Sequence, residues 1–158
     1  LSLSVGWSGL VGGQALDLSS GENGACIEDI HDGKTGVLFE AATLGGAASA
    51  GALDRMGPAF RDYACFLGRA YQAFDDILDQ VADDQLAGKS TSRDDGKLTA
   101  ITETGGMNEA LAEAKAQLEA AKDALPYPDQ PDTPLRLFTD HIFDHFSKAF
   151  EKSGLSNT

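Results

Sequence analysis

The chain has 158 residues, of which 42% are hydrophobic, and its formal net charge is −13. This length and composition favour one folded domain with a hydrophobic core over a disordered chain. Nucleic acids and anionic membranes require clustered positive charge, so the acidic excess argues against either as the main partner.

The two cysteines, Cys26 and Cys65, stand in no CxxC or metal-ligand spacing. Their spacing argues against a disulfide framework or a zinc site and favours free thiols in a reducing compartment. No apolar run reaches membrane-spanning length and no secretory leader is present, so we expect a cytoplasmic protein without stable membrane insertion. The chain begins at Leu1 rather than at a methionine, and we therefore expect that a segment precedes it.

The first predicted helix covers residues 6–17. Gly6, Gly9, Gly12 and Gly13 would lie near one of its faces, where another helix can approach closely. Each glycine costs about 1 kcal/mol of helix propensity relative to alanine, so this face should be tightly packed. After the turn residues "SSGENG", residues 26–51 read as helical on both sides of "DGKTG", whose two glycines mark a weak point in the helix.

Residues 58–84 carry the clearest helical pattern. Pro58 suits a first helical turn, and apolar residues then recur with a period near 3.6. This apolar stripe consists of Phe60, Ala64, Leu67, Tyr71, Phe74 and Leu78.

The remaining elements are also predicted to be helical. Residues 86–100 form a polar loop with glycines, and residues 107–125 have the Ala, Glu and Lys content of a good helix. A connector with four prolines, "PYPDQPDTP", precedes an amphipathic helix at residues 135–150. No alternating strand pattern occurs, so the sequence predicts an all-α fold with one domain and no internal repeat.

Three aspartates stand close together in the segment "YQAFDDILDQV". On a helix, Asp75, Asp76 and Asp79 share a face with Gln72, and like charges at this spacing repel one another. One interpretation is a Mg²⁺ site that holds a polyphosphate, because Mg²⁺ prefers oxygen ligands and a few carboxylates completed by water and phosphate. The other is a solvated acidic face, and this segment alone does not decide between them.

Three lysines that each stand beside a glycine flank the acidic helix: Lys34, Lys89 and Lys97. In so acidic a chain they are candidates for binding a diphosphate as point charges. A P-loop is excluded for "DGKTG" and "AGKST" because Glu28 and Asp83 stand where its first glycine is needed.

Two histidines, His141 and His145, lie four residues apart and could share a metal. No third ligand stands near them in the sequence, so surface histidines are the favoured interpretation.

Four segments in this order, "GLVGGQALDL", "IHDGKTGVLFEAATLGG", "LGRAYQAFDDILD" and "GKSTSRDDGKLT", resemble the trans-type prenyltransferases. This family contains the farnesyl and geranylgeranyl diphosphate synthases, and the resemblance covers residues 6–99 and, more loosely, the rest. It implies the all-α isoprenoid synthase bundle, Mg²⁺ as cofactor, and isopentenyl diphosphate and an allylic diphosphate as substrates.

The resemblance also implies roles for individual residues. Mg²⁺ would be bound by Asp75, Asp76 and Asp79, with the first and third the most secure, while Lys34, Thr35 and Gln72 would lie beside the allylic substrate and steady its developing carbocation. The allylic diphosphate would be held by Lys89 and Lys97, and the same cavity would be lined by Gln14, Asp17 and Tyr71, the last standing where phenylalanine is usual.

The family has two facing aspartate-rich motifs, and only the second occurs in these 158 residues. We therefore interpret residues 1–158 as the C-terminal half of a synthase domain that would be inactive alone, with the product length undetermined. Incomplete covering of the apolar helix faces predicts a homodimer. Two alternatives are a non-catalytic partner subunit, against which the retained Lys34, Thr35, Gln72 and Asp75 argue, and one chain of a split synthase.

Overall fold

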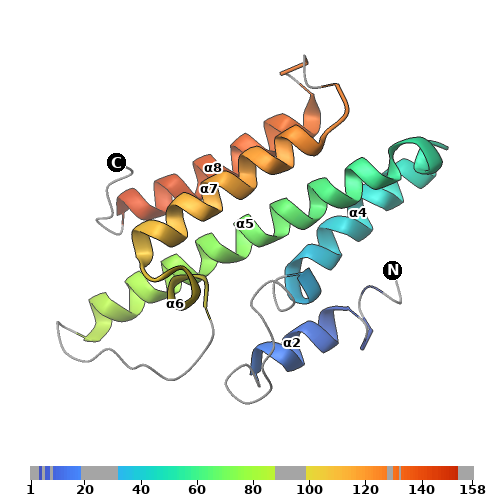
Figure 1. The fold of residues 1–158 in the computed structure, drawn as a ribbon. Coiled ribbons are helices and arrows are strands. Elements are labelled where there is room, and N and C mark those ends of the chain that lie inside the picture. The colour runs from blue at the N-terminus through green and yellow to red at the C-terminus, as the bar shows by residue number, and fades with distance from the viewer. Residues whose placement is uncertain are drawn as a thin grey trace.

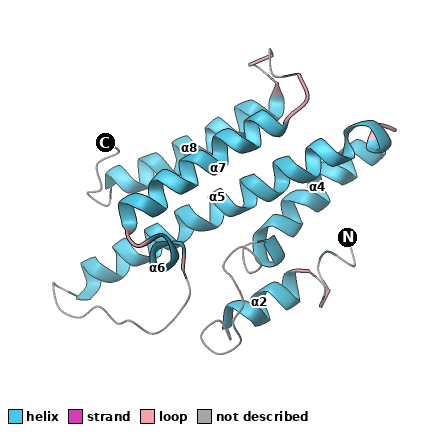
Figure 2. Ribbon diagram, in the orientation of Figure 1, coloured by secondary structure: helices cyan, strands magenta, loops and turns pink. Residues whose placement is uncertain are grey.

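The computed structural model describes residues 4, 6, 7, 9–18, 32–87, 99–127, 130, 131 and 133–152. These residues form helices joined by turns and loops, and the described part of the chain contains no strand (Figure 2). In order, the elements are α2 (Leu10–Leu18), η1 (Asp32–Gly36), α4 (Val37–Ser49), α5 (Leu53–Ala87), α6 (Ala100–Thr104), α7 (Met107–Ala124) and α8 (Pro134–Lys152). The predicted all-α fold is confirmed.

The 35-residue helix α5 is the central element of the bundle. It packs against η1 and α4 along one side and against α7 and α8 along another, while α2 lies beside η1 (Figure 1). Within the stripe predicted for this helix, Ala64, Leu67 and Phe74 are fully buried. The site described below therefore lies on helices that the core holds firmly.

Helix α5 begins at Leu53, five residues before the predicted start, so Pro58 lies inside the helix. A proline at this position cannot donate a hydrogen bond to the carbonyl four residues earlier, that of Asp54. Both residues are exposed, so water can satisfy that carbonyl. This explains how the helix continues through the proline.

Helix α7 approaches α5 closely because its buried side is made mostly of alanine. Ala110, Ala114, Leu118 and Ala121 are all buried and recur at steps of three and four residues. Small side chains at these positions allow the two helix backbones to come near each other. The helix predicted at residues 107–125 is thus confirmed, and its propensity-rich sequence also supplies the packing surface.

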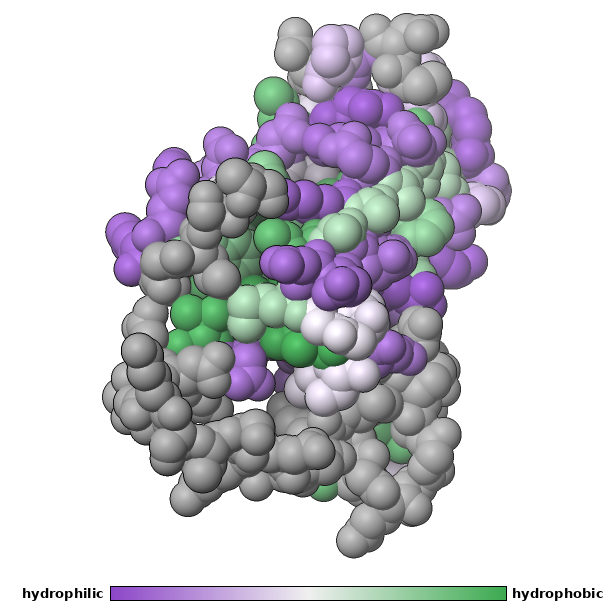
Figure 3. Space-filling model, turned by 60° about the vertical axis from the view of Figure 1, so that its left-hand side comes forward, coloured by the Kyte–Doolittle hydropathy of each residue, from purple (hydrophilic) through white to green (hydrophobic). Residues whose placement is uncertain are grey.

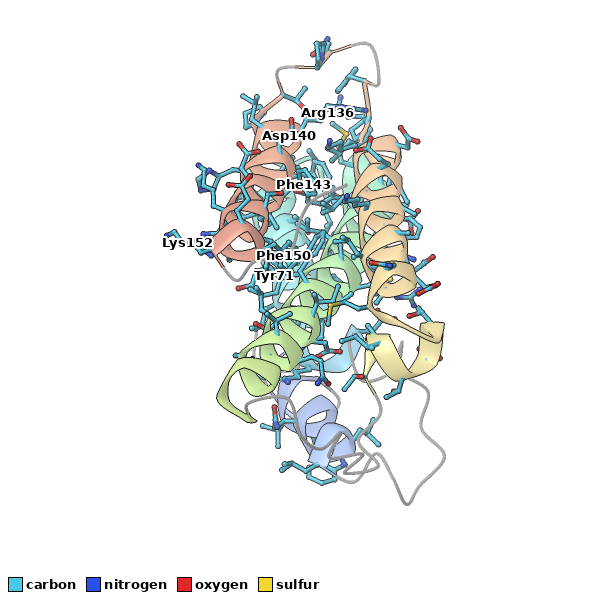
Figure 4. All side chains as sticks on the ribbon, turned by 90° about the vertical axis from the view of Figure 1, so that its left-hand side faces the viewer. Tyr71, Arg136, Asp140, Phe143, Phe150 and Lys152 are labelled. Atoms are coloured by element: carbon cyan, nitrogen blue, oxygen red, sulfur yellow. The ribbon has the colours of Figure 1, made fainter. Side chains whose placement is uncertain are left out.

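Helix α8 docks through aromatic side chains. Phe146 stacks on Phe74 with ring centroids 5.0 Å apart, and Phe150 lies 5.9 Å from the same ring. Phe143 and Phe150 point toward the neighbouring helices together with Tyr71, whereas Lys152 points outward (Figure 4). The buried hydroxyls of Tyr63 and Thr139 lie 3.1 Å apart and join α5 to α8 inside this apolar contact.

The short helix α6 follows directly after the undescribed residues 88–98. Thr99 begins it with a capping box, in which its side chain and that of Thr102 each accept from the other residue's backbone N–H. Gly105 ends it with φ 91°, a left-handed conformation that favours glycine. No helix in the described part of the chain is long and apolar enough to cross a bilayer.

Candidate functional site

The segment "DGKTG" forms the π-helical turn η1, which runs directly into α4. A π-turn adds a residue to a helical turn, and such turns occur frequently at functional sites. The predicted break at "DGKTG" corresponds to this turn, which carries Lys34 and Thr35. The helix predicted after it is present as α4, whereas the one predicted before it, from residue 26, lies outside the described residues.

Glycines bring the backbone of η1 into contact with helices on two sides. A Cβ added to Gly68 of α5 would lie only 2.5 Å from Cα of Gly36. A Cβ on Gly13 of α2 would collide with the backbone of Gly33 and Lys34. No side chain fits at either contact, so α2 and α5 hold the turn between them at backbone distance. The prediction that the α2 glycines mark a close helix contact is confirmed at Gly13.

A chain of hydrogen bonds crosses the site from η1 through α5 to α6. The hydroxyl of Thr35 donates to Oε1 of Gln72 at 2.9 Å, and Nε2 of Gln72 donates to Oδ1 of Asp76 at 3.2 Å. The backbone N–H of Ala100 donates to Oδ2 of Asp76 at 3.0 Å. Gln72 itself is only 5% exposed.

These contacts fix the direction of the hydrogen bonds that link Thr35, Gln72 and Asp76. A carboxylate only accepts, so Asp76 requires the amide nitrogen of Gln72 on its side. The amide oxygen then faces Thr35, and the Thr35 hydroxyl must donate to it. Thr35 also lines the apolar groove described below.

Asp75 and Asp79 lie four residues apart on α5, and their carboxylates repel each other. Partial burial raises the pKa of Asp75, and the charges of Asp79 and Asp76 raise it further, while Lys34 and a hydrogen bond from Gln72 lower it. The two carboxylates are thus an acidic pair for which Lys34 supplies positive charge nearby. A divalent cation bound between them would reduce this repulsion.

The donor set fits a hard cation such as Mg²⁺. Among the described residues, no three His, Cys, Asp or Glu side chains converge into a complete metal cage. Mg²⁺ rarely uses such a cage, because it commonly takes one or two carboxylates and fills its remaining positions with water and phosphate oxygens. Asp75 and Asp79 match that requirement, whereas both oxygens of Asp76 already accept hydrogen bonds.

An apolar groove of about 710 Å³ begins at Thr35 and Tyr71 and runs between α4, α5 and α8. Its wall is formed mostly by apolar side chains and backbone, including Leu38, Phe39, Ala42, Ala47, Phe60, Leu135 and Phe138. The Tyr71 ring lies 5.9 Å from that of Phe39 and meets Phe146 edge-on at 5.1 Å. On the face shown in Figure 3, apolar residues lie in a hollow bordered by polar ones.

The structure brings together five residues predicted for the site: Lys34, Thr35, Gln72, Asp75 and Asp79. Asp76 joins them through its hydrogen bonds, and Tyr71 lies at the adjoining groove. Gln14 is half-buried on α2, next to the glycine that contacts η1.

The structure does not describe every predicted site residue. Asp17 belongs to α2, but its side chain lies outside the described part, as do Lys89 and Lys97 entirely. The two histidines, His141 and His145, are exposed on α8. The contact between Asp32 of η1 and Arg69 of α5 was missed because no local sequence signal links residues 37 positions apart.

The polyprenyl synthetase family model matches residues 4–125. The chain belongs to the polyprenyl synthetase family. The matched region contains η1, the acidic helix face and α6, so it includes every described residue of the polar site.

Curated proteins from other organisms are similar to this chain over most of its length. The chain is 39% identical over 144 residues to geranylgeranyl diphosphate synthase of Cyanophora paradoxa, covering 88% of this chain and 48% of that protein. It is 35% identical over 147 residues to dimethylallyltranstransferase of Fischerella ambigua, covering 90% and 42%. The chain thus spans about half the length of the curated relatives it matches.

A solved structure shares the fold of this family member. A candidate farnesyl-diphosphate synthase from Marinomonas sp. MED121 superposes with a TM-score of 0.70 at 27% identity. The match covers 90% of this chain and 49% of that one. The predicted isoprenoid synthase bundle is thereby confirmed for the part present.

Proposed function

We propose that this chain is the C-terminal half of a polyprenyl diphosphate synthase, which joins isopentenyl diphosphate to an allylic diphosphate. The observation that carries the proposal is the oriented chain Thr35–Gln72–Asp76 beside the acidic pair Asp75 and Asp79. Thr35 lines the apolar groove, and Lys34 and the acidic pair belong to the same polar site. A reaction that separates an allylic cation from a diphosphate needs these features together.

Each described residue has a role in this proposal. Thr35 has its proton committed to Gln72, so its oxygen presents lone pairs toward a developing carbocation. Lys34 supplies positive charge for the diphosphate that leaves. The apolar groove suits an isoprenoid chain and keeps water away from the cation, which water would otherwise quench.

We assign Mg²⁺ to Asp75 and Asp79, with Asp76 as a supporting residue that orients Gln72. When bound, the metal would neutralise charge on diphosphate oxygens. The sequence prediction that Asp76 is itself a ligand stays open, since each of its oxygens keeps a further lone pair. The lysines Lys89 and Lys97 stay candidates for the allylic diphosphate, and Gln14 and Asp17 for the same cavity.

The whole product of the gene is the right material for testing this function. With Mg²⁺, isopentenyl diphosphate and dimethylallyl diphosphate, it should form a longer prenyl diphosphate, and chromatography of the product would give its chain length. Lys34→Ala should lower turnover by about 100-fold or more, as expected for removing a preorganised charge. Lys148→Ala, an exposed lysine on α8, is the matched control and should leave turnover unchanged.

The outcomes distinguish the possible forms of this proposal. Absence of any elongated product from the whole wild-type protein would overturn it. Activity that appears only after a second chain is added would favour a split synthase or a partner subunit. Activity of residues 1–158 alone would contradict the proposal that they are an inactive half.

We further propose a homodimer, because apolar side chains near the start of the chain are exposed. Trp7 is 76% exposed and Leu18 81%. Sedimentation of the whole protein as a monomer at micromolar concentration would contradict this. A cytoplasmic location is also proposed, because the spacing of Cys26 and Cys65 favours free thiols in a reducing compartment, and cell fractionation would test it.

A further inference from the structure

Asp32, the first residue of η1, forms a two-armed ion pair with Arg69 of α5. Nε of Arg69 donates to Oδ1 at 2.8 Å, and Nη2 donates to Oδ2 at 2.7 Å. The two side chains are 38% and 28% exposed, so water screens the contact only in part. Parallel hydrogen bonds between guanidinium and carboxylate fix relative orientation as well as distance.

Cys65, one helical turn before Arg69, makes a third contact with this carboxylate, its Sγ donating to Oδ1 at 3.5 Å. Burial raises the pKa of the Cys65 thiol, and the Asp32 charge raises it further, so the thiol stays protonated and can donate. Asp32 is therefore held by two side chains from one face of α5.

Further contacts attach η1 to that face of α5, besides this ion pair and the Cys65 contact. Gly68 contacts Gly36 at backbone distance, and Gln72 accepts from Thr35. The α5 residues involved, Cys65, Gly68, Arg69 and Gln72, follow one another at steps of three, one and three, which places them on one side of the helix. The attachments lie on both sides of Lys34 in the sequence.

The composition of η1 explains why it needs external attachment. Two of its five residues are glycine, which has more backbone freedom than any other residue. A π-helix is also rare and occurs mostly as a single turn, as it does here. The Thr35 contact and the glycine contact hold the end of the turn, and the Asp32 contacts described above hold its beginning to α5.

We propose that the Asp32–Arg69 ion pair is a positioning device that holds the π-turn so that Lys34 and Thr35 face Gln72 and Asp75. The catalytic purpose of this positioning rests on the proposed function, whereas the positioning itself is a property of the fold. Asp32 and Arg69 are positioning residues, because they act through Lys34 and Thr35.

The chain supplies a control in a second ion pair, which joins α5 to α4 rather than to η1. Nε of Arg61 donates to Oε1 of Glu40 at 2.8 Å, which joins α4 to α5 two helical turns away from Arg69. Removing it costs one interhelical ion pair but leaves η1 untouched. Arg61 and Glu40 border a different hollow, away from the groove that begins at Thr35.

Hydrogen exchange of the wild-type chain, Arg69→Gln and Arg61→Gln tests the positioning directly. Amides of residues 33–36 should exchange about tenfold faster in Arg69→Gln, because the turn opens locally, and should be unchanged in Arg61→Gln. The side-chain amide resonances of Gln72 should shift in Arg69→Gln alone. Arg69→Lys keeps the charge but loses the two-armed geometry. The exchange rates of residues 33–36 in this variant should lie between those of wild type and Arg69→Gln.

Equal exchange at residues 33–36 in the two glutamine variants would overturn the proposal. Faster exchange throughout α5 in Arg69→Gln would also overturn it, since the pair would then be a general stabiliser. In the whole protein, Arg69→Gln should lower kcat with little change in KM for isopentenyl diphosphate. If the whole wild-type protein made no prenyl diphosphate, the proposed function would fail, and the exchange measurement would still decide this inference.

Discussion

The hydroxyl of Thr35 and the amide oxygen of Gln72 lie 2.9 Å apart, although 37 positions separate them in the sequence. This bond ties the π-turn to the central helix in the middle of the site. Gln72 is nearly buried, so its amide oxygen has little access to replacement water. The bond therefore contributes to stability as well as to the orientation of Thr35.

Thr35→Val should lower the free energy of unfolding by about 1–2 kcal/mol, because it leaves the buried Gln72 oxygen without its donor. Thr35→Ser keeps the hydroxyl and should retain most of that stability. Urea unfolding of the two variants beside wild type gives the comparison. If the Thr35→Val and Thr35→Ser variants are equally stable, the hydrogen bond makes no net contribution to stability.

Gly68→Ala should destabilise the chain by about 1–3 kcal/mol, as is typical when extra atoms are forced into a packed contact. Its Cβ would press against the backbone of Gly36, which cannot move aside as a flexible side chain could. Gly45→Ala is the control, because a Cβ there meets nothing within 4 Å. That substitution should stabilise the helix by roughly 0.5–1 kcal/mol, since alanine loses less backbone entropy. Similar urea midpoints for the two variants would contradict the close contact.

The helices could be predicted from the sequence because their apolar residues recur at helical spacing. Leu67 and Phe74 of the predicted α5 stripe are buried, and so are Ile142, Phe146 and Phe150 within the helix predicted at residues 135–150. Tyr71 belongs to the same α5 stripe but is 36% exposed, because it borders the groove. A stripe identifies the inward face of a helix, and the spacing of neighbouring helices decides where a groove remains.

The grouping of Lys34, Thr35, Gln72 and Asp75 was predicted through family resemblance, and the described contacts between them are now defined. The ion pair of Asp32 with Arg69 and the bond from Ala100 to Asp76 could not be predicted. Each joins segments whose relative placement depends on how whole helices pack. Local spacing contains no information on that placement, and a second carboxylate in "DDILD" looks the same whether it binds a metal or a backbone N–H.

The unfolding free energies of Asp76→Ala and Asp79→Ala compare a carboxylate that accepts two hydrogen bonds with an exposed one. Removing Asp76 leaves the Ala100 N–H and the Gln72 amide without acceptors, so unfolding free energy should fall by about 1–3 kcal/mol. Removing Asp79, which is exposed, should change it by less than about 0.5 kcal/mol. Urea unfolding without divalent cations measures both.

Metal response provides an independent comparison of the same two carboxylates. Mg²⁺ with inorganic diphosphate should raise the melting temperatures of wild type and of Asp76→Ala. The melting temperature of Asp79→Ala should rise much less. The opposite pattern would identify Asp76 as a ligand and contradict our assignment.

The raised pKa of Asp75 predicts a particular pH dependence of stability. Because the native state holds this proton more tightly than the unfolded chain, the native state binds more protons just above the ordinary pKa of 3.8. Stability should therefore fall as pH rises from that value through the native pKa, and the loss should persist at neutral pH. Asp75→Asn cannot ionise, so it should lack this loss and be more stable than wild type at pH 7.

Unfolding free energies of wild type and Asp75→Asn, measured from pH 4 to pH 8 with a chelator present, test the sign. Asp79→Asn should reduce the slope without removing it, because the Asp79 charge is the second cause of the shift after burial. A wild type that gains stability over Asp75→Asn as pH rises would show that Lys34 and Gln72 outweigh burial and repulsion. In that case the acidic pair would need no cation to be stable, and the electrostatic argument for a metal there would lose its basis.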